Sequence, residues 1–287
     1  MNNIKYFFQY IILSFLFIIF RLLGIKKSSI ISGKILCKLG PLFRSNSISY
    51  NNLSKAFPNL NDTEKKIIVK NMWFNYGRIL SEYVFIKNFR YSEELSKNIM
   101  VENQSILEQI KKNDEPVIFI SGHFNNFELM AMHIEKSGID LAAIYRPLNN
   151  KYLNPTMEKI RKNYICKKQI KKGLSGTKEI LRYFKDGTSV ALMIDQRVSE
   201  GIKCNFFNNL AFTTTIPAQF VKKFQAKIVP VYIERKEGHK FKIKFYDFLE
   251  FSKEQSIESI TVKLNEILEK MIVKNPDQWI WSHNRWK

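Results

Sequence analysis

Hydrophobic residues fill the start of the chain almost without interruption. The run from Tyr6 to Ile25 is broken only by Gln9, Ser14, Arg21 and Gly24. About twenty apolar residues match the thickness of a bilayer when helical. The alternative is a helix that lies in the interface with Arg21 extended toward the headgroups. A buried core helix fits the length less well, and no small-x-small site follows to mark a cleaved signal peptide. We therefore predict a membrane anchor over 1–25 and a folded domain over 26–287.

Beyond the anchor, the hydrophobic period changes repeatedly between that of helices and that of strands. Ile68, Met72, Tyr76 and Tyr83 recur at helical spacing after a turn at 58–62. From Pro116 onward, apolar strand-like runs alternate with amphipathic segments. The predicted strands are 117–120, 139–145, 189–194, 227–233 and 239–248, the last two an antiparallel pair; the predicted helices are 102–111, 127–137, 151–164, 175–185, 216–224 and 257–273. This alternation predicts an α/β fold with a central, mostly parallel sheet flanked by helices.

The first of these strands leads into the most informative stretch of the chain. Val117 to Ile120 is followed by Ser121-Gly122-His123, and good helix formers continue from Phe127 to Gly138. His123 is thus expected at a strand-to-helix corner with Glu128 in the first helical turn. Across such a corner a carboxylate five residues away can hold one imidazole nitrogen, which leaves the other free to accept a proton. We therefore predict His123 as a general base and Glu128 as its orienting partner.

A structural interpretation of the same residues competes with this chemistry. Asn125 has the side chain of a helix N-cap, and Glu128 then stands at the third helical position of a capping box. His123 would in that case be an ordinary loop histidine. The spacing alone does not decide between the two interpretations, because short motifs match by chance.

Polar residues also follow other strands of the predicted sheet. Arg146 ends the second strand, Asp195 ends the third, and three threonines at 213–215 precede a helix. Each is compatible with a surface turn or a helix cap. Because ligands gather beyond the carboxyl ends of parallel strands, we expect these groups near His123 in one cleft.

Composition excludes several classes of enzyme. The chain has 287 residues, 45% of them hydrophobic, so it can bury a large core. No Gly-x-Gly occurs, and Gly173-Leu174-Ser175-Gly176 is not a Gly-x-Ser-x-Gly elbow, which disfavours nucleotide enzymes and serine esterases. Three widely spaced cysteines suit a reducing compartment, and neither they nor the histidines form a metal-ligand spacing, so no metal is expected.

The formal net charge of +20 points to acidic partners. No acidic residue precedes Asp62, whereas lysines and arginines are frequent in that stretch. More positive charge follows the apolar run than precedes it, which predicts a domain on the cytoplasmic face of a membrane rich in anionic lipid. A nucleic-acid-binding protein is disfavoured, because the basic stretch has no motif that reads bases.

Taken together, the motifs resemble the lipid A biosynthesis lauroyl/myristoyl acyltransferases. The His-x4-Glu block is Gly-His-Phe-Asn-Asn-Phe-Glu at 122–128, and further similar blocks stand, in the same order as in the family, at 52–58, 145–150, 195–197, 213–215 and 276–287. His-x4-acid alone is shared with many glycerolipid acyltransferases, whose fold the resemblance also implies. Departures from the pattern are small: Asn126 and Phe127 replace residues more common in the family.

The resemblance implies transfer of a fatty acyl group from acyl carrier protein, the thioester donor, to a hydroxyl of a Kdo-bearing lipid A precursor at the bacterial inner membrane. No bound cofactor is implied. Arg161 and Asp195 match positions associated with activity in the family, the first with a charge role near an oxyanion or phosphate and the second with an orienting role. Arg146 is expected to clamp a phosphate of either substrate. The alternative is another glycolipid or glycerophospholipid O-acyltransferase with the same chemistry.

Overall fold

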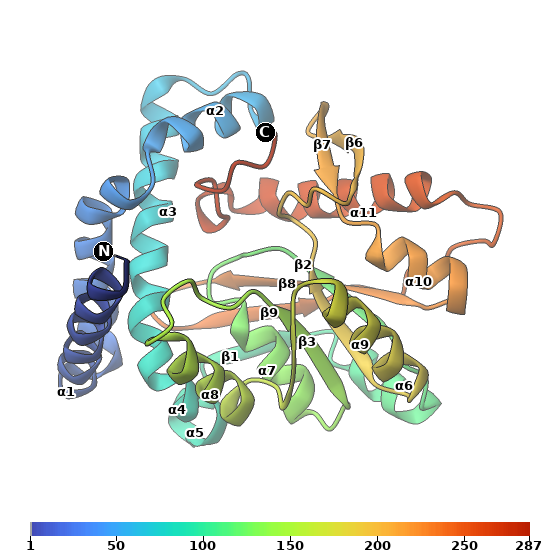
Figure 1. Cartoon of the computed structure of the whole chain (residues 1–287), viewed down its shortest axis with the longest axis horizontal. Helices are drawn as coiled ribbons and strands as arrows, with labels where there is room; N and C mark the ends of the chain where they lie inside the picture. The colour runs from blue at the N-terminus through green and yellow to red at the C-terminus, as the bar shows by residue number, and fades with distance from the viewer. Residues whose placement is uncertain (1) are drawn as a thin grey trace.

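The computed structural model describes residues 2–287 as an α/β domain with a long helix along one side (Figure 1). The sheet has seven strands in the order β1-β9-β8-β2-β5-β3-β4. Their bounds are β1 Ile99–Glu102, β2 Ile118–Ser121, β3 Leu141–Tyr145, β4 Lys168–Lys171, β5 Ser189–Met193, β8 Ile228–Arg235 and β9 Phe241–Phe245. Strands β8, β2, β5, β3 and β4 run parallel, and β9 pairs antiparallel with β8. The predicted α/β class with a mostly parallel sheet is confirmed.

Within the described residues, six helices follow or connect strands of the sheet, and those between the parallel strands divide between its two faces. They are α6 Ser105–Asn113, α7 Glu128–Lys136, α8 Asn154–Tyr164, α9 Leu174–Lys185, α10 Ile216–Phe224 and α11 Ile257–Lys274. Helices α7 and α8 lead from β2 through β3 to the edge strand β4, whereas α9 and α10 lead back from β4 through β5 to β8. Because crossovers between parallel strands are right-handed, the first two helices lie on one face of the sheet and the last two on the other. Phe184 of α9 packs on Phe220 of α10 with ring centroids 5.1 Å apart, as expected for neighbours on one face.

The N-terminal third is helical and leads into the sheet. It comprises α1 Asn2–Phe43, α2 Asn46–Ala56, α3 Asp62–Glu82, the 3-10 turn η1 Tyr83–Phe85, α4 Ile86–Tyr91 and α5 Glu93–Ser96. Asn61 and Glu64 form a capping box that begins α3. α1 and α3 pack so closely at Gly77 that a Cβ on this residue would lie 2.2 Å from the Ser32 carbonyl oxygen.

Several short elements were absent from the sequence prediction. β1 and β4 are four residues each, and the β6 Ile202–Phe206 and β7 Asn209–Thr213 hairpin stands apart from the main sheet. β4 reads Lys-Gln-Ile-Lys and carries no apolar run, so its sequence resembles a loop. The chain ends with the 3-10 turn η2 Pro276–Gln278 and a tail that lies over the carboxyl ends of the strands.

Candidate active site

His123 lies beyond the carboxyl end of β2, where the sequence predicts it, and its partner comes from the neighbouring strand β5. The Nδ1 atom of His123 lies 2.7 Å from Oδ1 of Asp195, and the backbone N–H of His123 donates to Oδ2 at 2.8 Å. Asp195 is fully buried, and its Oδ2 also accepts a hydrogen bond from the Trp279 indole at 2.9 Å. The carboxylate therefore fixes both the ring and the backbone of His123, while Nε2 faces the cleft near the Gln196 amide.

This geometry corrects the predicted contact between Glu128 and His123. The imidazole nitrogen that Glu128 was expected to hold is held by Asp195 instead. Glu128 begins α7, and its Oε1 accepts hydrogen bonds from Arg161 Nε at 2.8 Å and from the Tyr83 hydroxyl. The reason is the strand order: β5 lies beside β2 and delivers Asp195 closer to the ring than the first turn of α7 delivers Glu128.

Electrostatics in this cluster favour a protonated or hydrogen-bonded imidazole. Burial lowers the pKa of His123, but the Asp195 carboxylate beside it and the more distant Glu128 outweigh burial, so the pKa lies above its usual value. Burial raises the pKa of Asp195, whereas His123 and the Trp279 indole lower it more strongly, and the net shift is downward. An ionised aspartate next to a histidine with a raised pKa is the arrangement of an oriented general base.

Arg161 forms the second charged centre of the cleft. It extends from α8 to Glu128, with Nη2 2.7 Å from Oε1, and it donates to the Tyr83 hydroxyl at 3.2 Å. Its remaining nitrogen, Nη1, is buried without a hydrogen-bond partner among residues 2–287. A buried guanidinium N–H with no partner is ready to bind an oxygen of a ligand.

The alternative capping interpretation of Asn125 is wrong. Asn125 has a positive φ of 41°, and its side chain contacts Gln278 and accepts from Arg235 Nε at 3.1 Å rather than capping α7. Arg235, at the end of β8, pairs with Glu82 across Nη1–Oε1 at 2.6 Å, and both are buried. Asn126 donates to the same carboxylate at 3.1 Å. The loop that carries His123 is therefore fastened to a buried ion pair.

The backbone N–H groups that follow Gly122 stand where an oxyanion could be bound, but they already have partners within the protein. His123 N donates to Asp195, Phe124 N to the Gly122 carbonyl and Asn125 N to the Gln278 carbonyl. Arg161, which lines the cleft, instead offers Nη1, a donor with no partner in the described part of the chain.

The cleft around these groups has a volume of about 400 Å³ and two kinds of lining. Its basic and polar rim includes Arg44, Arg146, Lys172, Gln196, Thr214 and His283. Arg146 is exposed at this rim, and of the three threonines at 213–215 it is Thr214 that lines the cleft. Burial lowers the pKa of His283 to about 4, so this histidine is neutral and accepts from the Arg197 N–H at 3.0 Å.

An apolar arm of the cleft runs over the sheet. Ala143 of β3 and Ala191 of β5 are paired across the strands, and Ala131 of α7 lines the same space. Gln169 of β4, paired with Ala143 on the other side, closes the row and is held by the Cys166 carbonyl at 3.0 Å. Three alanines on the lining of one cleft leave room for a hydrocarbon chain.

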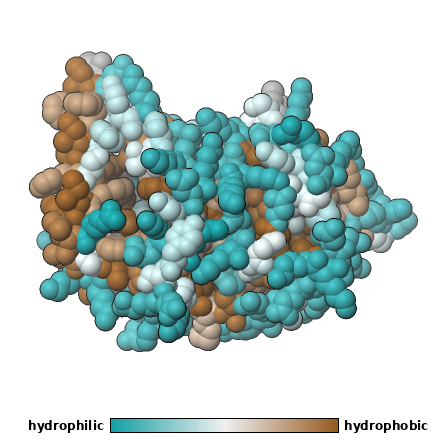
Figure 2. All heavy atoms as spheres, turned by 90° about the horizontal axis from the view of Figure 1, so that it is seen from below, coloured by the Kyte–Doolittle hydropathy of each residue, from teal (hydrophilic) through white to brown (hydrophobic). Residues whose placement is uncertain are grey.

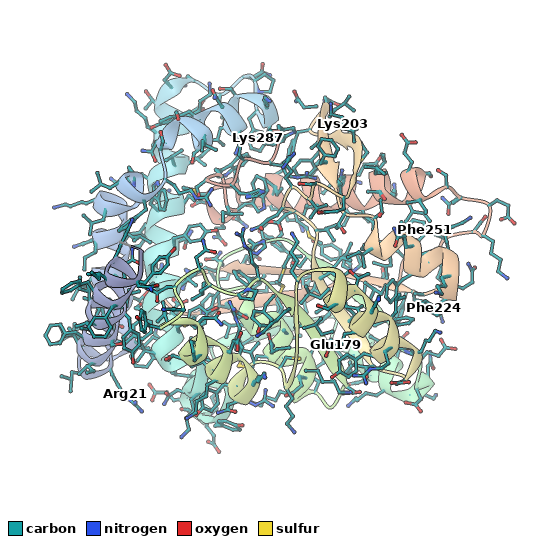
Figure 3. All side chains as sticks on the ribbon, viewed as in Figure 1. Arg21, Glu179, Lys203, Phe224, Phe251 and Lys287 are labelled. Atoms are coloured by element: carbon teal, nitrogen blue, oxygen red, sulfur yellow. The ribbon has the colours of Figure 1, made fainter. Side chains whose placement is uncertain are left out.

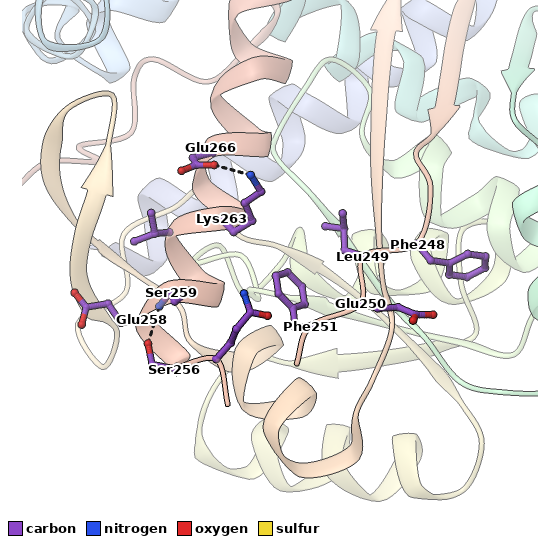
Figure 4. A pocket seen from close by; sticks show the side chains of 11 residues that line it. Phe248, Leu249, Glu250, Phe251, Ser256, Glu258, Ser259, Lys263 and Glu266 are labelled. Atoms are coloured by element: carbon purple, nitrogen blue, oxygen red, sulfur yellow. Dashed lines mark hydrogen bonds and ion pairs between the residues drawn. The ribbon is translucent and has the colours of Figure 1, made fainter. Parts of the chain in front are cut away.

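A second hollow, of about 830 Å³, lies between the segment after β9 and the start of α11 (Figure 4). Its polar groups are already used locally: Ser256 caps α11, and Lys263 pairs with Glu266 at 3.0 Å. Among the described residues that line it there is no histidine and no arginine. We therefore place the candidate chemistry in the cleft at His123.

Several site residues were not found from the sequence. Trp279, in the C-terminal tail, donates to Asp195. Asn52 holds the same tail in place, because it donates to the carbonyl oxygens of Trp281 and His283 at 2.8 and 2.7 Å. Tyr83 contacts Arg161, and the Glu82–Arg235 ion pair contacts the loop that carries His123. A charge within an otherwise apolar run was the available signal for Glu82, whereas Arg235 stands among other charged residues at 234–237 and carried no such signal. Within residues 2–287, no cluster of three or more acidic, histidine or cysteine side chains is arranged to hold a metal ion.

Known proteins with similar sequences share one description. A family model for bacterial lipid A biosynthesis acyltransferases matches residues 1–287. Lipid A biosynthesis acyltransferase 2 of Shigella flexneri is 25% identical over 238 residues, which cover 80% of this chain and 74% of the relative. The lipid A biosynthesis myristoyltransferase of Escherichia coli K12 is 22% identical, and the match covers 87% of this chain and 76% of the relative. The lipid A biosynthesis acyltransferase of Haemophilus influenzae is 24% identical, and the match covers 85% of this chain and 78% of the relative.

Proposed function

Because the chain belongs to the bacterial lipid A biosynthesis acyltransferases, we propose that it transfers a fatty acyl group from acyl carrier protein to a hydroxyacyl chain of a Kdo-bearing lipid A precursor. The family that the motifs indicated is thereby confirmed, and with it an acyltransferase that acts on a lipid A precursor. The observation that supports the chemistry best is the His123–Asp195 pair at the mouth of an apolar arm.

The reaction begins with activation of the acceptor hydroxyl. A hydroxyl is a weak nucleophile at neutral pH, so His123 Nε2 takes its proton as the oxygen attacks the thioester carbonyl carbon. Asp195 holds the tautomer with the proton on Nδ1 and stabilises the imidazolium that forms. General-base catalysis of this kind contributes about 10²–10⁴-fold in rate.

The negative charge on the tetrahedral intermediate needs a donor inside the cleft. Arg161 has an unpartnered buried N–H, and Glu128 and Tyr83 fix the orientation of its guanidinium. We assign Arg161 to the oxyanion and Glu128 to holding Arg161 in place. When the carbon–sulfur bond breaks, the imidazolium returns its proton to the departing thiolate. The ester then forms without a covalent enzyme intermediate.

Substrates of the proposed reaction match the lining of the cleft. The fatty acyl chain lies along Ala131, Ala143 and Ala191, and the phosphates of the precursor or of the donor's phosphopantetheine meet Arg146 and the other basic rim residues. The high net charge speeds encounter with acidic acyl carrier protein and favours anionic lipid. The helix α1, long and apolar enough to cross a membrane, attaches the domain to the cytoplasmic face of the inner membrane.

A choice of acceptors tests this function. Membranes that contain the enzyme are incubated with an acyl carrier protein thioester and either a Kdo-bearing tetra-acyl lipid A precursor or a lysophospholipid. A gain of one acyl mass by the precursor alone supports the proposal. Acylation of the lysophospholipid alone would contradict it and would indicate a glycerophospholipid acyltransferase instead.

A further inference from the structure

α1 is bent, and its two halves are separate helices. Gly24, with φ 72° and ψ 165°, interrupts the helical geometry, and a side chain there would strain the backbone. The second half lies along α3, where Gly33 meets Gly77. The first half, with Arg21 near the bend, lies beside it at the edge of the molecule (Figure 3).

One face of the first half is turned toward the rest of the molecule. Most of its partly or fully buried residues recur at helical spacing and form one inner face, among them Tyr6, Tyr10, Leu13, Phe17 and Phe20. Near its start, Asn150 Nδ2 donates to the Tyr6 carbonyl at 2.9 Å, and the rings of Phe7 and Tyr152 lie 5.5 Å apart. Near its end, Phe20 is only 1% exposed. The start of the apolar run therefore contacts the 150–152 loop, and its end is buried within the molecule.

The outer face of the same helix is apolar and exposed. It comprises Ile4, Phe7, Phe8, Ile11, Ile12, Phe15, Ile18 and Leu22. The second half of α1 also exposes apolar side chains, at Ile30, Ile31, Leu39, Leu42 and Phe43. Hydrophobic residues gather at this end of the molecule (Figure 2). An apolar surface on one side and protein on the other is the arrangement of a helix that lies along an interface.

Charges at the ends of the first half limit its depth. Lys5 stands at its start, and Arg21, Lys26 and Lys27 surround the bend, all exposed. Such side chains stay at headgroup level, because a charge in the hydrocarbon is costly. If the run from Tyr6 to Phe20 crossed the bilayer, the attached loop with Asn150 and Lys151 would have to enter it as well.

From these contacts we infer that residues 2–43 form a bent helical pair that lies flat in the cytoplasmic leaflet of an anionic membrane, with both ends on the cytoplasmic side. The first helix does not span the bilayer. This inference rests on the membrane attachment in the proposed function. Because the Asn150 loop continues from Arg146 at the cleft rim, the embedded helix stands beside the entrance to the cleft. A lipid acceptor thus reaches the cleft from within the leaflet.

Crosslinking of the full-length chain in native membranes tests the inference. The variant Phe7→Cys with Tyr152→Cys places two thiols where the rings now touch, and mild oxidation should join them, as seen in the mass of the linked peptides. The matched control is Phe7→Cys with Lys203→Cys, because Lys203 lies on the β6–β7 hairpin away from α1 (Figure 3) and should give no link. Absence of the 7–152 link would overturn the inference.

Labelling of Asn3→Cys distinguishes a wrong pose of the first helix from a wrong assignment of membrane attachment. A membrane-impermeant maleimide should label it in inside-out vesicles and not in intact spheroplasts. Labelling from the periplasmic side, with acyl transfer retained, would overturn the flat pose and leave the proposed function intact. Recovery of the whole protein in the soluble fraction after lysis would overturn both the pose and the proposed membrane attachment.

Discussion

Nδ1 of His123 and Oδ1 of Asp195 lie 2.7 Å apart, although 72 residues separate them in the chain. The neighbouring strands β2 and β5 bring them together, and Trp279 holds the other carboxylate oxygen. In the reaction that we propose, these two residues are the base and the orienting group of a triad whose nucleophile is the substrate hydroxyl.

Substitution Asp195→Asn tests whether the carboxylate orients His123 and stabilises its imidazolium. We expect kcat to fall by about 10²–10⁴-fold, because an amide does not hold the reactive tautomer or stabilise the imidazolium. Trp279→Phe removes one hydrogen bond to the same carboxylate but keeps its charge, so a smaller loss is expected. A variant Asp195→Asn with wild-type kcat would exclude the orienting role.

The pH dependence of kcat/KM follows from the raised pKa of His123. The base must be neutral, so the rate should fall as the pH drops through a value above the usual 6.5. In Asp195→Asn the influence that raises the pKa is lost while burial still lowers it, so the remaining activity should persist to lower pH. An unchanged acid limb in this variant would contradict the assignment.

Glu128→Gln should reduce turnover through Arg161. The carboxylate pairs with the guanidinium in a mostly buried place, and its loss frees the proposed oxyanion donor to reorient. Loss of one such donor decreases kcat by about 10²–10³-fold. Tyr83→Phe keeps the Glu128–Arg161 pair and serves as the control, with a decrease below about tenfold. Equal losses in the two variants would indicate general damage to the site rather than a specific effect on Arg161.

Ala143→Leu should shorten the preferred acyl chain. The added side chain fills the arm between Ala131 and Ala191, so longer donors should lose more kcat/KM than shorter ones in a competition among acyl carrier protein thioesters. Val198→Leu, elsewhere on the lining, is the control and should leave the order of donors unchanged. If Ala143→Leu reduces all donors by the same factor, the arm does not hold the acyl chain.

The ion pair between Glu82 and Arg235 should matter for stability. Removal of one partner leaves the other charge buried, which costs about 3–5 kcal/mol. Glu82→Gln is expected to lower the thermal midpoint by several degrees in a calorimetric scan, because the network also holds the loop of His123 through Asn125 and Asn126. Lys263→Gln, which removes an exposed ion pair with Glu266, should leave the midpoint nearly unchanged.

Much of the fold was predictable because hydrophobic periodicity is local. It located α7, α10 and α11 and the strands that end at His123 and Asp195. Periodicity does not state which strands are neighbours, so the pairing of His123 with Asp195 rather than Glu128 required the sheet order. The roles of Trp279 and Asn52 were hidden for a similar reason, because the tail reaches the site only after the chain has folded.

The most direct test compares wild type with His123→Ala for the mass of the product. Membranes with either protein are incubated with Kdo-bearing tetra-acyl lipid A precursor and several acyl carrier protein thioesters. We expect the wild type to add one acyl mass and the variant to add almost none, while both remain in the membrane fraction. Acylation by His123→Ala at the wild-type rate would contradict the assignment of His123 as the general base.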